Sequence, residues 1–121
     1  MANKYKHTSE LLQEKIDPII EIFFDFAQLK NIYRQGWLDH GIPEKDCETD
    51  ADHIFGVALL GYIIAKEYRP DLNAEKVMKL GLFHELGKVF VGDITPRDGM
   101  DNDKRKQLEL EAVKKVFSKM P

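Results

Sequence analysis

The chain has 121 residues, of which 43% are hydrophobic and 32% charged, a balance typical of one globular domain. The chain has 18 lysines and arginines and 21 acidic residues. The resulting net charge of −3 argues against a surface that coats nucleic acid. The single Cys47 excludes an internal disulfide and favours a reducing compartment. The N-terminus lacks the apolar core of a secretory signal, and the longest apolar run, residues 54–65, is too short to span a bilayer. We therefore predict a cytoplasmic protein with no membrane segment and one domain over residues 1–121.

The first strong helix signal along the chain is Asp17-Pro18. Aspartate caps helices and proline suits the first helical turn. Apolar residues then recur at helical spacing and predict a helix over residues 18–33. A weaker signal upstream predicts a short helix that ends at Lys15.

A segment rich in glycine and proline follows, and residues 35–46 are predicted to form a loop. Trp37 lies in this loop, with Arg34 just upstream. One interpretation makes Trp37 an aromatic cap on the core. The other makes it a stacking surface for a flat ligand such as a nucleobase.

Three more helices are expected after the loop. Thr49 is expected to cap a helix that runs to about Tyr68, and this helix is apolar on nearly every face, which predicts the central helix of the fold. Asn73 caps the next helix, and Asp101 or Asn102 begins the last one. No alternating strand pattern appears, so the predicted fold class is all-α.

Two histidines stand out because of their positions on these helices. His53 lies at the start of the second long helix, and His84 lies near the end of the third, directly before Glu85. Antiparallel packing of the two helices would bring these residues together. Because a buried histidine beside a buried carboxylate needs compensation, a divalent metal is one explanation, and ordinary core hydrogen bonding is the other. Lys88 stands where a zinc-protease H-E-x-x-H motif requires its second histidine, so that motif is excluded.

Over about residues 25 to 97 the chain resembles the HD-domain superfamily of metal-dependent phosphohydrolases, and the fit is best to the branch of 5′-deoxynucleotidases and oxetanocin-type proteins. The resemblance implies an all-α bundle of about five or six helices. The matching motifs are Leu29-Lys30, Arg34-Gln-Gly-Trp37, Glu48-Thr-Asp-Ala-Asp-His53, Phe83-His84-Glu85-Leu-Gly-Lys88 and Val91-Gly-Asp-Ile94-Thr-Pro96.

The resemblance implies a divalent metal ion (cobalt, manganese, magnesium, nickel or zinc) held by His53, His84 and Glu85. Glu85 stands where the family has aspartate. The family's last metal-binding aspartate falls beyond Pro121, so we expect an HD-type domain that is short at its C-terminus and lacks the family's last helices.

The same resemblance implies substrate binding by Arg34 and Trp37, and catalytic roles for Lys88 and Asp93. Lys88 stands where the nucleotidase branch typically has glutamate and matches the H-D-x-G-K form of other branches.

Three functional hypotheses follow. The first is a metal-dependent phosphohydrolase acting on nucleoside or deoxynucleoside monophosphates, or on another phosphorylated small molecule. The second is a degenerate, non-catalytic HD domain that binds a nucleotide or a protein partner. The third is a helical scaffold that forms a homodimer through an uncovered apolar face between Leu108 and Phe117.

Overall fold

The computed structural model describes residues 17–118, and within them the fold is all-α, as predicted. The short helix expected to end at Lys15 lies outside the described residues. An isolated antiparallel bridge between Tyr33 and Thr49 is the β-type pairing found in the described part. The α-helices are α2 (Pro18–Gln28), α3 (Gln35–Asp39), α4 (Asp50–Tyr68), α5 (Ala74–Phe83), α6 (Lys88–Val91) and α7 (Asn102–Phe117). Short 3-10 turns cover Leu29–Asn31, Glu44–Asp46 and Pro96–Asp98.

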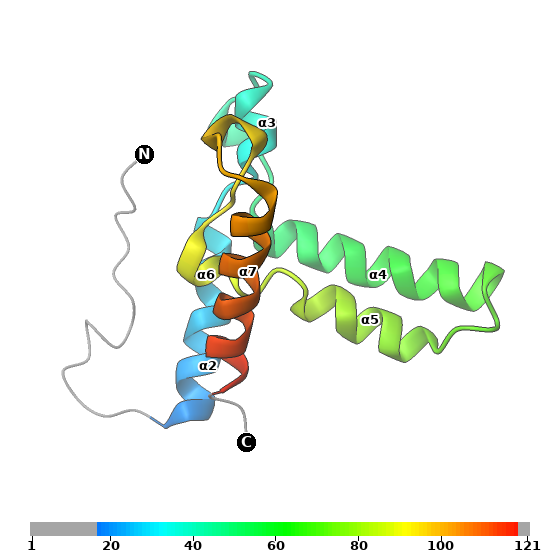
Figure 1. Cartoon of the computed structure of the whole chain (residues 1–121). Coiled ribbons are helices and arrows are strands. Elements are labelled where there is room, and N and C mark those ends of the chain that lie inside the picture. The colour runs from blue at the N-terminus through cyan, green and yellow to red at the C-terminus, as the bar shows by residue number, and fades with distance from the viewer. Residues whose placement is uncertain (1–16, 119–121) are drawn as a thin grey trace.

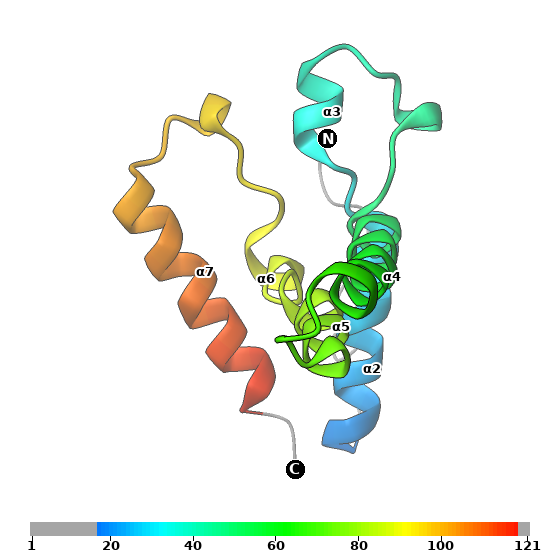
Figure 2. The ribbon, with the colours of Figure 1, turned by 90° about the vertical axis from the view of Figure 1, so that its right-hand side faces the viewer.

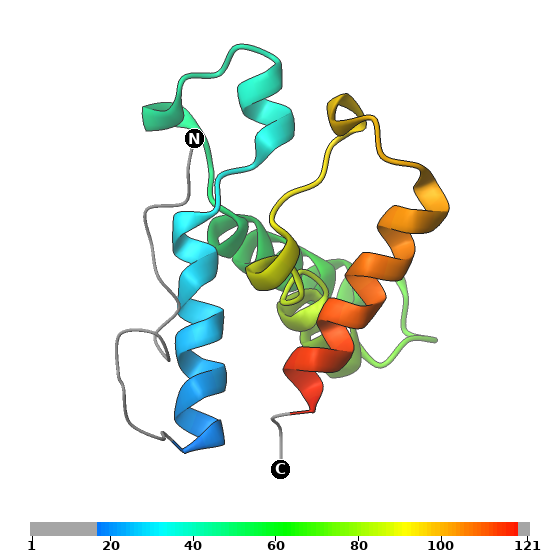
Figure 3. The ribbon, with the colours of Figure 1, turned by 60° about the vertical axis from the view of Figure 1, so that its left-hand side comes forward.

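The helices divide into a hairpin and a group of three. α4 and α5 form an antiparallel hairpin that projects away from the other helices (Figure 1). α6 lies between α2 and α7 (Figures 2 and 3). A small core joins the two parts where the hairpin begins, and its fully buried members are Leu29, Ile54, Leu86 and Val116.

The chain leaves α2 earlier than the sequence predicted. The α-helix ends at Gln28, and Ile32 adopts an extended conformation with φ −104° and ψ 110°. This conformation allows the amide of Asp50 to donate to the carbonyl of Ile32 at 2.7 Å and the amide of Arg34 to donate to the carbonyl of Glu48 at 3.0 Å. The prediction of a helix over 18–33 was wrong because these hydrogen bonds are not local in the sequence.

The segment predicted to be a loop is more ordered than expected. Residues 35–46 contain the short helix α3 and the 3-10 turn Glu44–Asp46, joined by Gly41 at a φ of 84°. The loop prediction was wrong for these turns because glycine and proline mark where helices end without excluding short ones between them.

Capping predictions were confirmed because they depend on local chemistry. Thr49 and Asp52 form a reciprocal capping box at the start of α4. The Asn73 side chain accepts the amide of Lys76 at the start of α5, and Asp101 caps α7. The Thr49 and Asn73 caps fix where the two helices of the hairpin begin.

The prediction that α4 is the central, buried helix was wrong for the described part of the chain. There, α5 packs along α4 and the 3-10 turn after α2 contacts its start, while the remaining faces stay open. Ile54, Ala58 and Ala65 are buried. The exposed large apolar side chains of α4 include Phe55, Val57, Leu59, Leu60, Ile63 and Ile64. None of the helices in the described residues is long and apolar enough to cross a membrane.

Candidate metal centre

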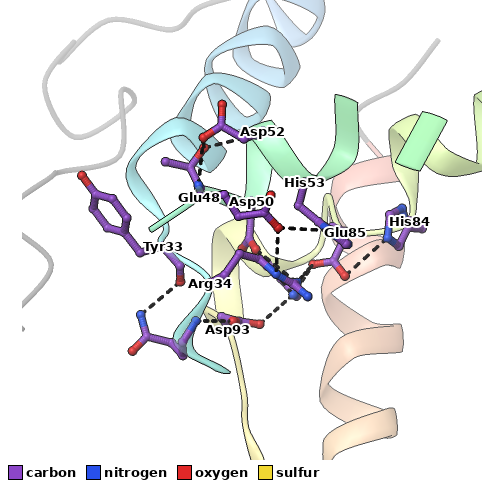
Figure 4. Close-up of polar contacts among 12 residues, drawn as sticks. Tyr33, Arg34, Glu48, Asp50, Asp52, His53, His84, Glu85 and Asp93 are labelled. Atoms are coloured by element: carbon purple, nitrogen blue, oxygen red, sulfur yellow. Dashed lines mark hydrogen bonds and ion pairs between the residues drawn. The ribbon is translucent and has the colours of Figure 1, made fainter. Parts of the chain in front are cut away.

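The antiparallel hairpin brings the two predicted histidines together. His53 lies in the first turn of α4, and His84 is the C-cap of α5. Their ring centroids are 5.7 Å apart in an edge-to-face arrangement (Figure 4). The helix positions in the sequence permitted this meeting of the rings, and the structure places them together.

Each ring has a neighbour at its Nδ1 atom, a hydrogen-bonding carbonyl for His84 and a carboxylate at ion-pair distance for His53. The carbonyl of Gly81 accepts a hydrogen bond from Nδ1 of His84 at 2.7 Å, and Nε2 of the same ring lies 3.4 Å from Oε1 of Glu85. Nδ1 of His53 lies 3.4 Å from Oε1 of Glu48. Partners of this kind fix the tautomer of a metal-binding histidine and leave the opposite nitrogen free to coordinate.

Burial also favours the neutral form of His53. It lowers the pKa of the ring below its ordinary value, and the nearby positive charge of Arg34 lowers it further against the opposing effect of Glu85 and Glu48. A neutral imidazole is the form that binds a metal ion.

Glu85 completes a set of three possible ligands. Its carboxylate is largely buried, and one ligand atom each from His53, His84 and Glu85 all lie within 4.8 Å of one another. Two imidazoles and one carboxylate are a donor set that divalent transition metals accept, with further positions left for water or substrate.

Lys88 lies on the other side of the Glu85 carboxylate. Its ammonium group contacts Oε2 of Glu85, lies 2.6 Å from Oδ1 of Asp93 and lies 3.6 Å from Oδ1 of Asp50. Burial alone would lower the pKa of Lys88, but the hydrogen bonds to Asp93 and Glu85 and the charge of Asp50 raise it above its ordinary value. Lys88 is therefore a fixed positive charge in the site.

Asp93 lies in the site and makes contacts with two different segments. Oδ1 pairs with Lys88, and Oδ2 accepts the backbone amide of Gln35 at 2.7 Å. Asp93 therefore connects Gln35, at the start of α3, to Lys88.

Asp50 is a member of the site that the sequence analysis missed. Its side chain is fully buried, and Oδ1 lies 3.5 Å from Nη1 of Arg34. Burial raises the pKa of Asp50 to about 6, and the positive charge of Lys88 only partly opposes this. From the sequence, Asp50 was identified only as one position of the motif from Glu48 to His53. Helix geometry could have separated it from Asp52, because residues three apart, such as Asp50 and His53, share one face.

The two predicted substrate-binding residues have different places. The guanidinium of Arg34 lies in the site, 3.5 to 3.9 Å from the carboxylates of Asp50, Glu85 and Glu48. Trp37 lies on α3 and is 42% exposed, so it is not part of the buried core. The backbone amide of Trp37 donates to the carbonyl of Arg34 at 3.0 Å, but no hydrogen bond or ion pair joins the Trp37 side chain to the site among the described residues. Its role in substrate binding stays a prediction.

The HD domain family matches this chain over residues 26–121. The chain belongs to this family. The HD domain is 32% identical over 99 residues to the protein named 5′-deoxynucleotidase HDDC2 of Dictyostelium discoideum, an alignment that covers 78% of this chain and 51% of the relative. It is 35% identical over 93 residues to 5′-deoxynucleotidase YGK1 of Saccharomyces cerevisiae, and this alignment covers 76% of this chain and 41% of the relative. It is 31% identical over 95 residues to the human 5′-deoxynucleotidase HDDC2, and this alignment covers 78% of this chain and 44% of the relative. The HD domain thus spans about half the length of these curated relatives, or less.

A solved structure has the same architecture. A conserved hypothetical protein from Pyrococcus furiosus superposes on the HD domain with a TM-score of 0.71 and 29% sequence identity, over 82% of this chain and 60% of that one.

The charge balance of the centre in this HD domain fits a divalent cation. Four carboxylates face only two cationic side chains, which leaves two negative charges in a largely buried cluster. One doubly charged ion would balance them. The carboxylates are those of Glu48, Asp50, Glu85 and Asp93, and the cations are Arg34 and Lys88.

Proposed function

We propose that this HD domain is a metal-dependent phosphohydrolase that acts on nucleoside monophosphates, deoxynucleotides included. The observation that carries the proposal is the pair of oriented imidazoles beside Glu85, in a cluster whose charge calls for a divalent cation. The names of the relatives supply the substrate class.

In this proposal His53, His84 and Glu85 hold the ion, which is cobalt, manganese, magnesium, nickel or zinc. When bound, such an ion supplies a Lewis acid and lowers the pKa of water into the neutral range. Glu48 and the carbonyl of Gly81 keep the two rings turned toward it.

Arg34 and Lys88 are the residues proposed to bind the substrate phosphate. Both lie beside Glu85, and a guanidinium can hold two phosphate oxygens at once. As negative charge develops on the phosphoryl oxygens, these fixed cations stabilise it. Because the cluster without an ion carries two excess negative charges, phosphate binding should depend on the metal.

Asp93 and Trp37 have supporting roles in the proposal. Asp93 holds Lys88 in place. It can also orient the attacking water or accept a proton from it. Trp37, exposed on α3 three residues after Arg34, is proposed to stack on the base.

The test is phosphate release from deoxynucleoside monophosphates in the presence of cobalt, manganese or magnesium. We expect turnover by the full chain, its loss in His84→Gln, and its retention in His40→Gln. His40 is a matched control because the residue is exposed and the one hydrogen bond of its ring among the described residues is to the carbonyl of Gly36. Equal turnover in the two variants, or none in the unaltered chain, would refute the proposal.

One observation favours a non-catalytic alternative. Arg34 and Lys88 are each paired with three carboxylates, so both cations are already engaged before any phosphate arrives. A domain that binds nucleotides without hydrolysis would show a nucleotide-dependent rise in melting temperature and no released phosphate.

A homodimer is proposed from the open apolar faces. Leu110 and Phe117 of α7 are exposed, as are several large apolar residues of α4. Sedimentation of the chain at micromolar concentration as a monomer would contradict it.

A further inference from the structure

Glu85 belongs to two groups of possible ligands at once. One group is His53, His84 and Glu85, and the other is Asp50, Glu85 and Asp93. In each group the ligand atoms lie within 4.8 Å of one another. The second group offers only carboxylate oxygens, which suit hard cations such as magnesium and manganese.

The second group already surrounds a cation. The Lys88 ammonium contacts Glu85 and lies 2.6 Å from Asp93 and 3.6 Å from Asp50. Arg34 reaches Asp50 and Glu85 of this group, whereas no ion pair joins it to Asp93 among the described residues. Lys88 is therefore the cation that all three carboxylates share.

The burial of Asp50 is separate evidence for a cation position in this group of carboxylates. Its side chain is fully buried, and neither of its carboxylate oxygens accepts a hydrogen bond from a described residue. A buried carboxylate in such surroundings requires a cation close by. The aspartate satisfies this requirement only through the ion pairs with Arg34 and Lys88.

We propose that the Lys88 side chain occupies a second cation position next to the metal site, so that the centre binds one divalent ion and not two. Glu85 bridges the two positions, with Oε1 toward His84 and Oε2 toward Lys88. This inference rests on the proposed metal site. It predicts that an uncharged residue at position 88 leaves three carboxylates that recruit a second ion.

The experiment measures the number of Mn²⁺ ions bound per full-length chain by equilibrium dialysis. We expect one ion in the unaltered protein, two in Lys88→Met and one in Lys88→Arg. The double variant Asp50→Asn with Lys88→Met should return to one, because it removes one carboxylate of the second position. One ion in Lys88→Met, bound as tightly as in the unaltered chain, would overturn the inference.

A spectroscopic measurement keeps the inference testable even if Lys88→Met folds poorly. In the electron paramagnetic resonance spectrum with excess Mn²⁺, the unaltered chain should give the signal of an isolated ion. A spin-coupled pair in the unaltered chain would overturn the inference and leave the proposed metal site standing. No bound Mn²⁺ in either form would instead remove the metal site itself and the inference with it.

Discussion

The helices α4 and α5 approach each other closely at Gly81, three residues before His84. A Cβ atom at Gly81 would lie 2.8 Å from Cα and 3.1 Å from the backbone nitrogen of Ala58. Because both are backbone atoms, a change of side-chain rotamer cannot relieve the clash, and α5 must move away from α4. The carbonyl of Gly81 also holds the ring of His84. We therefore expect Gly81→Ala to weaken both the fold and the metal site.

The magnitude follows from two opposing effects. Overpacking costs about 1–3 kcal/mol, and a backbone clash of this kind belongs at the upper end of that range. Alanine is favoured over glycine inside a helix by about 1 kcal/mol. The net loss of unfolding free energy in Gly81→Ala should therefore be about 2 kcal/mol.

Gly56 of α4 provides the matched control. A Cβ atom there meets nothing within 4 Å, so Gly56→Ala should gain the helix preference of about 1 kcal/mol without a clash. Urea denaturation of both variants measures the difference, expected to be about 3 kcal/mol. Mn²⁺ affinity should fall about tenfold in Gly81→Ala alone, because a neighbour that orients a ligand is disturbed. Gly81→Ala as stable as Gly56→Ala would refute the reasoning.

Three further predictions concern the surroundings of the site. Leu86→Ala removes a fully buried side chain next to Glu85 and should lower the unfolding free energy by about 2–5 kcal/mol in urea denaturation. A loss below about 1 kcal/mol would contradict the place of Leu86 in the core. Thr49→Ala breaks the capping box with Asp52 and should cost about 1 kcal/mol by the same assay, whereas Thr49→Ser should keep most of it. Burial raises the pKa of the Cys47 thiol. At neutral pH a disulfide reagent should therefore modify Cys47 far more slowly in the folded protein than in the protein unfolded in urea. Equal rates would contradict the burial of Cys47.

Features that depend on local chemistry could be predicted from the sequence. Thr49 and Asn73 were identified as caps, and the choice for the last helix was narrowed to Asp101 or Asn102, because a cap interacts with backbone amides two or three residues away. The approach of His53 and His84 was also predictable, since two consecutive antiparallel helices bring opposite ends together.

Features that depend on distant partners could not be predicted. The end of α2 is set by two hydrogen bonds, in which the carbonyl of Ile32 accepts the amide of Asp50 and the amide of Arg34 donates to the carbonyl of Glu48, and no local pattern reveals them. The apolar residues of α4 indicate a helix that avoids water, but the pattern does not say which element covers each face. Asp50 and Asp52 look equivalent in the sequence, yet one is buried with Arg34 and the other caps a helix in solvent.

The central claim is that His53, His84 and Glu85 bind one divalent ion. Anomalous diffraction from crystals grown with Mn²⁺ tests it most directly, since the scattering locates the ion without reference to activity. We expect one strong peak bounded by these three side chains, and no peak at that place in crystals of His84→Gln. A peak elsewhere, or an empty centre at saturating Mn²⁺, would contradict the account.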